Sequence, residues 1–379
     1  MCKVIAAPGA AGCNSAAAMP TLGEIRASIP KHCFERSLVK SLFYTLRSVL
    51  FTAGFGAAAC SVLPMELTAN SSALWVCYAI VQGTIMMGLW VEAHEAGHMA
   101  YSSSPIANDA VGFCLHSFLL VPYFSWQKSH NTHHARCNHL LDGETHNPDL
   151  KRKVSKSLDK MLHLVFGWVL YLVFHTTGSR RSPVTGERYK RKPNHFSPFA
   201  SNELFAEKLR FKVLLSSLGV AGMLGLLALA SAEVGLKAVA LLYFGPYVVV
   251  NGWLVLYTWL QHCHPDVPFY GEDSWNWLAG ALSTVDRPYP WVVDELHHHI
   301  GSTHVCHHVF HELPHYHAVE ATAAIKAFLG DHYRFEPMGI TASLFQTAKH
   351  CHYVEALNGV QYFQSAIDDH RAAQKAKDL

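Results

Sequence analysis

Apolar residues in this sequence are gathered into long runs and do not alternate with polar ones. A helix needs about 20 consecutive apolar residues to cross the hydrocarbon core of a bilayer. Four windows reach this length: residues 42–63, 72–91, 213–231 and 238–259. The pattern therefore predicts four transmembrane helices.

Two shorter apolar runs, 111–124 and 161–174, have the length of interfacial or re-entrant helices. Hydrophobic residues make up 50% of the chain and charged residues only 15%. We expect an all-α integral membrane protein with about four transmembrane helices, additional interfacial helices and a cytosolic cap. We divide it into a cytosolic N-terminal segment (1–40), a membrane domain (41–360) and a polar C-terminal tail (361–379).

Basic residues are unevenly placed. The segment 127–212 contains many of them, whereas loop 64–71 has none and loop 232–237 has one. Short basic loops stay on the cytosolic side of a membrane, so we expect both termini and segment 127–212 to face the cytosol. The net charge of +2 and the lack of a nucleic-acid motif argue against a nucleic-acid partner. The basic runs are better explained by attraction to lipid headgroups.

The motif His-x-x-His-His occurs twice, at His130/His133/His134 and at His304/His307/His308. With 27 histidines in 379 residues, about 0.14 such motifs are expected by chance. Positions i, i+3 and i+4 share one helical face, so the three imidazoles of each motif can converge on one point. A single copy could be a run of solvated histidines, but two copies indicate a metal site.

A weaker pair, His94 and His98, lies at the end of the second apolar window. The predicted topology places this pair and both triplets at the cytosolic face of the membrane. Catalytic zinc uses three protein ligands, so eight imidazoles suit two metal ions better than one zinc. Imidazole binds iron, copper and zinc alike, and the residues by themselves leave the metal open.

The boxes HEAGH, HNTHH and HVCHH, in this order and spacing, resemble the three histidine boxes of the membrane fatty acid desaturases. Longer segments, including PTLGEIRASIPKHCFERS and GALSTVDRPY, resemble the Δ12 (oleate, omega-6) branch of that family. The similarity extends from about residue 20 to residue 355. It departs from the branch at Met99, where a histidine is common, and in ARCNHLLDGETHNPD (135–149), where a short acidic pair is usual.

The resemblance implies a non-haem di-iron enzyme of the endoplasmic reticulum membrane. Such an enzyme uses O2, with electrons from a separate cytochrome b5 and its reductase, to convert an oleoyl chain of a lipid or acyl-CoA into a linoleoyl chain. The ligands that it implies are His94, His98, His130, His133, His134, His304, His307 and His308. His262 and His298 stand where the branch usually has histidine, and each could be a further ligand or could orient one.

Several alternatives remain. Omega-3 desaturases, hydroxylases, acetylenases and conjugases use the same boxes, and a non-enzymatic receptor could retain them. HEAGH also matches the zinc protease motif H-E-x-x-H, with Glu95 as general base, but this reading leaves six box histidines unused. Glu95 and Asp286 are also candidates to hydrogen-bond the ring N–H groups of ligands.

Overall fold

The computed structural model describes residues 19–150 and 157–365, and the side chains of 157–161 are not described. The outer parts of the predicted terminal segments, 1–18 and 366–379, lie outside these residues. Within the described part, four helical segments are long and apolar enough to cross a membrane: Leu38–Val62, Ala69–Gly97, Glu207–Val234 and Leu236–His262. Each contains or nearly coincides with one of the four predicted windows, so the all-α membrane architecture is confirmed.

The long helices begin and end where the sequence supplies caps. The Ser37 side chain accepts a hydrogen bond from the Lys40 N–H at the start of α2 (Leu38–Val62). Thr68 and Ser71 form a reciprocal capping box at the start of α3 (Ala69–Gly97). Gly235, with φ +88°, ends α7 (Arg210–Val234) and lets the chain turn directly into the next span.

The fourth span is made of α8 (Leu236–Val239), a π-helical turn η3 (Ala240–Phe244) and α9 (Gly245–Leu260). Helix α3 is the centre of the bundle, because it packs against α2, against α4 (Pro105–Phe118) and most extensively against α9. A Cβ atom added at Gly83 would lie 2.5 Å from the carbonyl oxygen of Pro246. The absence of a side chain at Gly83 therefore allows α3 and α9 to approach closely.

The two shorter apolar runs do not form straight spans. Helix α4 and helix α5 (Tyr123–Ala135) meet at an angle of 106° and form either a broken span or a re-entrant loop. Helix α6 (Ser157–Phe174) packs against α9. The run 161–174 thus belongs to the shorter class of helix that the sequence predicted, and the run 111–124 covers the bend between α4 and α5.

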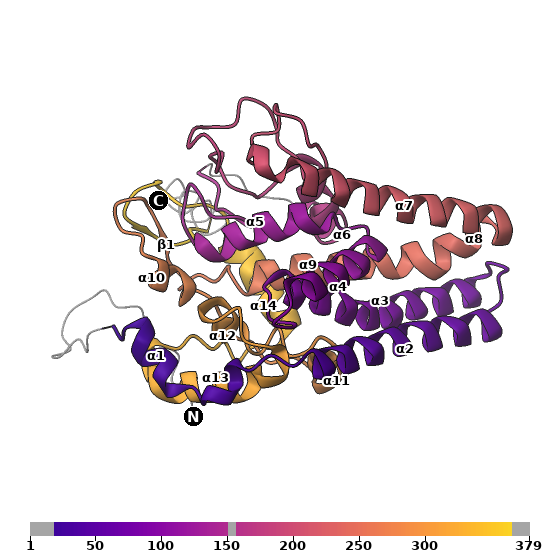
Figure 1. Ribbon diagram of the computed structural model, residues 1–379, viewed down its shortest axis with the longest axis horizontal. Coiled ribbons are helices and arrows are strands. Elements are labelled where there is room, and N and C mark those ends of the chain that lie inside the picture. Colours follow the sequence, from indigo (N-terminus) through magenta and orange to yellow (C-terminus); the bar gives the residue numbers. More distant parts are fainter. Residues whose placement is uncertain (1–18, 151–156, 366–379) are drawn as a thin grey trace, which may run out of the picture.

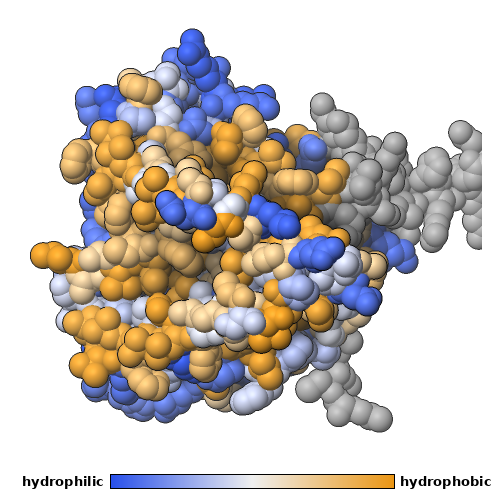
Figure 2. Space-filling view, turned by 90° about the vertical axis from the view of Figure 1, so that its right-hand side faces the viewer, coloured by the Kyte–Doolittle hydropathy of each residue, from blue (hydrophilic) through white to orange (hydrophobic). Residues whose placement is uncertain are grey.

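The outer faces of the bundle are apolar. Exposed side chains include Phe43 and Leu50 on α2, and Phe211 and Leu226 on α7. Figure 2 looks at the end of the molecule where the long hairpins turn, and apolar residues cover much of that face. A soluble protein rarely exposes so much apolar surface, so this surface is suited to contact with lipid.

The opposite end of the molecule is a cap of short elements (Figure 1). Near the N-terminus these are α1 (Leu22–Ser28) and η1 (Lys31–Phe34), and the turn η2 (Glu207–Leu209) precedes α7. The C-terminal third supplies α10 (Trp277–Ala281), α11 (Trp291–Leu296), α12 (His304–Val309), α13 (His315–Leu329), η4 (Gly330–His332) and α14 (Ile340–His350). Strands β1 (Phe269–Tyr270) and β2 (Val360–Gln361) pair antiparallel.

Candidate metal centre

The three histidine boxes lie on three helices that meet where the bundle joins the cap. His94 is in the last turn of α3 and His98 caps that helix. The second box occupies the last turns of α5, and the third box forms most of the short helix α12. The 3.6-residue helical period turns the imidazoles of each box toward the same point.

Five of these histidines form a first donor group. Ring nitrogens of His94, His98, His130, His134 and His307 all lie within 4.8 Å of one another. The Nε2 atoms of His94 and His98 are 3.2 Å apart, and so are those of His130 and His134. Donors bound to one first-row metal ion are separated by about 3 Å, so this group has the spacing of a single metal site.

Four histidines form a second donor group beside the first. His133, His262 and His308 offer nitrogens within 4.8 Å of one another, and His304 Nε2 lies 3.0 Å from His262 Nε2. The rings of His134 and His308 stack with their centroids 4.2 Å apart, which joins the two groups. We refer to these residues as the nine-histidine cluster: His94, His98, His130, His133, His134, His262, His304, His307 and His308.

Hydrogen bonds within the protein do not satisfy these rings. Buried ring nitrogens without a hydrogen-bond partner occur at six of the nine, and His308 has both of its nitrogens in that state. Leaving a buried polar atom unpaired costs about 1–3 kcal/mol. At four of the six the unpaired atom is the outer Nδ1, and the Nε2 atoms of these rings have only another imidazole as partner. The donor set and its spacing therefore fit a pair of metal ions. The six residues with unpaired ring nitrogens are His94, His98, His134, His304, His307 and His308.

His298 is the predicted ligand that the structure does not bring to this cluster. Its Nε2 atom lies 3.3 Å from Glu92 Oε1, and His315 Nε2 approaches the same oxygen at 3.3 Å. His298 and His299 have φ values of +52° and +61°, and they form a left-handed turn after α11. This turn directs the His298 ring toward Glu92 and not toward the nine-histidine cluster.

The two acidic residues expected to hydrogen-bond ligand rings do not do so, and that prediction was wrong. Asp286 Oδ1 accepts a hydrogen bond from the backbone N–H of Val305 at 2.8 Å, and Tyr333 donates to Oδ2. Glu95 Oε2 accepts from the His315 N–H at 2.9 Å, whereas Glu95 Oε1 is 4.0 Å from His94 Nδ1. The reason is helical geometry: Asp286 caps the first turn of α12, and Glu95 points toward α13.

One ligand ring is oriented by the backbone. His133 Nδ1 donates to the carbonyl oxygen of Glu144 at 2.9 Å. This bond leaves the His133 Nε2 lone pair free to face a metal ion, as the outer hydrogen bonds of metal-bound histidines usually do. The sequence did not indicate this role, because a backbone carbonyl carries no residue signature.

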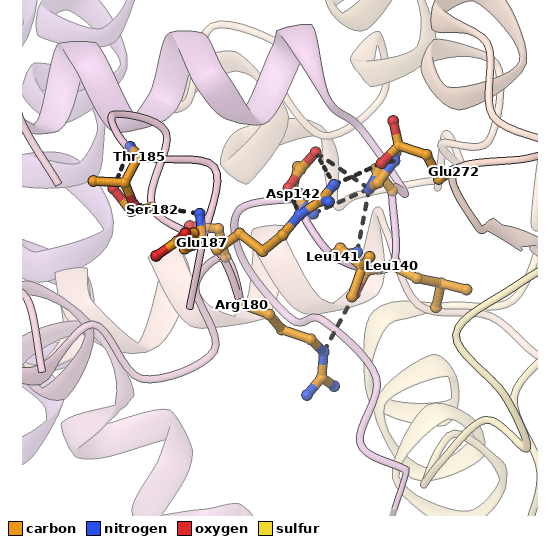
Figure 3. Close-up of polar contacts among 12 residues, drawn as sticks. Leu140, Leu141, Asp142, Arg180, Ser182, Thr185, Glu187 and Glu272 are labelled. Carbon is orange, nitrogen blue, oxygen red and sulfur yellow. Dashed lines mark hydrogen bonds and ion pairs between the residues drawn. The ribbon is translucent and has the colours of Figure 1, made fainter. Parts of the chain in front are cut away.

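The segment that carries Glu144, residues 135–149, is anchored by Arg180, which Figure 3 labels, and by the neighbouring Arg181. Arg180 Nε donates to the Leu140 carbonyl at 3.2 Å, and the Arg180 N–H donates to the Leu141 carbonyl at 2.8 Å. Arg181 makes a two-pronged ion pair with Asp142 and also reaches Glu272 at 2.6 Å. These contacts hold the Glu144 carbonyl in place for His133.

Burial keeps the third box neutral. It lowers the pKa of His304 to about 3, and it lowers the pKa of His307 and His308 well below the usual value. A metal-binding imidazole must be unprotonated at the ligating nitrogen. At neutral pH these three rings are therefore in the form that binds a metal.

Tryptophans line the membrane side of the first donor group. The Trp90 ring stacks on His94, and the Trp126 ring stacks on His130 with centroids 4.6 Å apart. Trp168 packs edge-on against Trp90. This apolar wall belongs to the largest hydrophobic core of the described residues and keeps water away from that side of the cluster.

On the other side, the cluster borders an open cavity of about 420 Å³ that His98, His134, Asn131 and Trp277 help to line. His311 also lines it, with its ring centroid 4.9 Å from that of His98. No pattern in the sequence singles out His311 among the many histidines outside the boxes. The cavity connects the edge of the first donor group to solvent.

Comparisons with known proteins identify the family of the chain. The family model described as fatty acid desaturase matches residues 71–337. A Delta(12) fatty acid desaturase of Calendula officinalis is 38% identical over 92% of both chains. An oleoyl-12-hydroxylase of Ricinus communis is 39% identical over 89% of this chain and 88% of its own, and a Delta(12)-fatty-acid desaturase of Arabidopsis thaliana is 38% identical over 88% of each. The chain belongs to the fatty acid desaturase family.

Proposed function

We propose that this chain is a Δ12 desaturase that uses O2 to insert a cis double bond into an oleoyl chain and so forms a linoleoyl chain. The observation that carries the proposal is the meeting of nine imidazoles, in two adjoining donor groups, at one end of an apolar helix bundle. The names of several relatives supply the regiochemistry.

We assign two non-haem iron ions to the cluster. His94, His98, His130, His134 and His307 would hold one ion, and His133, His262, His304 and His308 would hold the other. The chemistry that bound iron would supply is the reduction of O2. Removal of two hydrogens from an unactivated methylene pair requires this reduction. His298 is left out of this assignment because it faces Glu92.

The protein residues prepare the site for this chemistry. The Glu144 carbonyl orients the His133 ring, and Asp286 fixes the start of α12, the helix that carries three of the ligands. Trp90 and Trp126 cover the membrane side of the cluster and exclude water from it. An oxidising centre that is shielded in this way reacts with its substrate in preference to solvent.

The substrate in this proposal is an acyl lipid or an acyl-CoA. Electrons would come from a separate cytochrome b5 and its reductase, delivered from the side of the cap. We place the protein in the endoplasmic reticulum membrane as a multi-pass protein, because it has several candidate spans and a relative from Glycine max carries that membrane in its name. We place the histidine boxes in the cytosol because basic residues are concentrated in segment 127–212.

A second candidate, hydroxylation of the same acyl chain, is favoured by one relative, the oleoyl-12-hydroxylase of Ricinus communis. The same cluster could serve both outcomes, since hydroxylases that resemble this branch use the same histidine boxes. The zinc protease alternative is not supported. Its general base would be Glu95, and that carboxylate already accepts a hydrogen bond from the His315 backbone N–H.

Expression in a yeast that makes oleate but no linoleate tests the proposal. We expect a new diene with double bonds at the Δ9 and Δ12 positions, located by gas chromatography of derivatised fatty acids. A His307→Ala variant, which removes a ligand from the first donor group, should form no product. A hydroxylated product would support the second candidate, and the absence of any new product from membrane-inserted protein would contradict both.

A further inference from the structure

A second set of metal-binding side chains lies on the outside of the cap, away from the nine-histidine cluster. His32, Cys33, His317 and Glu320 each offer one ligand atom, and all four atoms lie within 4.8 Å of one another. His32 and Cys33 belong to η1, near the N-terminus, and His317 and Glu320 belong to α13. The set therefore joins two segments that are more than 280 residues apart in the sequence.

The distances are close to those of a tetrahedral site. The Sγ atom of Cys33 is 3.7 Å from His32 Nε2, and His32 Nε2 is 2.9 Å from Glu320 Oε2. The His32 and His317 rings meet edge to face, with centroids 5.5 Å apart. Nitrogen, oxygen and sulfur ligands of a tetrahedral zinc ion are separated by about 3.3–3.8 Å. Donors at the 4.8 Å limit would need to move inward by about 1 Å, which exposed side chains can do by small rotations.

The simpler explanation is an ion pair between His32 and Glu320 with Cys33 packed beneath it. An ion pair between side chains that are about half exposed, 51% and 52% here, contributes little to stability. It also does not account for the His317 ring, which offers a fourth donor beside the other three. Four donors of the types that zinc prefers, arranged around one point, call for a ligand at their centre.

We propose that His32, Cys33, His317 and Glu320 bind a structural zinc ion. One thiolate and one carboxylate would balance its two positive charges, and two neutral imidazoles would complete a closed four-coordinate shell. The site leaves no open position for catalysis. It is separate from the proposed iron centre, and neither assignment depends on the other.

The place of this site in the fold indicates what zinc would do. Figure 1 shows α1 and η1 lying against α13 at the outer edge of the cap. Cys33 is fully buried in a hydrophobic core that also contains Val305 and Val309 of α12. Zinc would fasten the N-terminal segment to α13 over this core.

Elemental analysis of the purified full-length protein tests this directly. We expect about one zinc per chain in addition to any iron, retained after desalting. Cys33→Ser, His317→Gln and Glu320→Gln should each lower the zinc content several-fold and leave the iron content unchanged. Cys60→Ser and His332→Gln, which alter an exposed cysteine and an exposed histidine elsewhere, should keep the zinc.

Cobalt substitution gives a second readout that does not depend on zinc content. A thiolate bound to Co²⁺ produces a charge-transfer band in the near ultraviolet, and the nine-histidine cluster contains no thiolate that could produce it. We expect the band in the wild type and in Cys60→Ser, and its loss in Cys33→Ser. Wild-type protein without zinc, or zinc that all three site variants retain, would overturn the proposal. Iron retention and a single peak in size exclusion show that each variant has folded.

Discussion

At the scale of single residues, Glu144 contributes to the structure through both its backbone carbonyl and its buried side chain. Its carbonyl holds His133, and its side chain is completely buried, where it accepts hydrogen bonds from Ser179 Oγ at 2.9 Å and Tyr171 OH at 3.3 Å. The pKa of the Glu144 carboxyl is raised to about 8 from the usual 4.5, and burial is the largest cause of this increase. The folded protein therefore holds a proton at neutral pH that the unfolded chain releases.

This difference predicts a pH dependence of stability. Between pH 4.5 and about 8 the folded state binds more protons at Glu144 than the unfolded state does, so its contribution to stability falls as the pH rises through that window. Glu144→Gln has no proton to lose and should not show this fall. We expect its apparent Tm in detergent micelles to exceed that of the wild type at about pH 8.5 by about 2 °C or more, and to differ less at about pH 5.

Glu187→Gln is the matched control, because it makes the same change at a glutamate that is exposed. It should follow the wild-type pH dependence throughout. Equal slopes for Glu144→Gln and the wild type would show that the Glu144 carboxyl is ionised in the folded protein at neutral pH.

At the scale of elements, the centre depends on the contact between α3 and α9. Helix α3 ends in His94 and His98, and α9 ends just before His262, so the spacing of these two helices sets the distance between ligands from both donor groups. Gly83 lies where they touch, and an added Cβ would stand 2.5 Å from both the Pro246 carbonyl and Val249 Cβ. The backbone oxygen cannot move aside without shifting α9.

Gly83→Ala should therefore push the two helices apart. We expect a loss of about 1–3 kcal/mol of stability, as for other overpacked sites, together with weaker iron retention. Gly54→Ala on α2 is the control, because a Cβ there meets nothing within 4 Å. Thermal unfolding and elemental analysis of both variants make the comparison; equal behaviour of the two would contradict the role of this contact.

The elements also show what a sequence pattern can and cannot predict. The four spans were predictable because long apolar runs carry their own signal. The short helices of the cap were not, apart from the helical turn expected at the third histidine box, because short segments have little tendency to form a helix alone. Helix α12, which holds that box, has only six residues. That helix is stabilised by tertiary contacts, among them the Asp286 cap on Val305, which join residues far apart in the sequence.

At the scale of the whole molecule, the fold gathers histidines from three boxes and from the end of α9 at one end of an apolar bundle. The eight box histidines could be selected from the sequence because their spacing repeats. His262 and His298 looked equivalent there, since each is a single histidine at a family position. Only the folded structure distinguishes their positions. His262 follows the last turn of α9, whereas His298 lies in a left-handed turn and its ring faces Glu92.

The metal content of the purified protein is the most direct test of the nine-histidine centre. The proposed assignment predicts about two iron ions per chain in the wild type and in His298→Ala. It predicts about one or fewer in His262→Ala, because this variant removes one of four ligands from the second donor group. A wild-type protein with a single iron, or a His298→Ala variant that loses iron while His262→Ala keeps both ions, would contradict it.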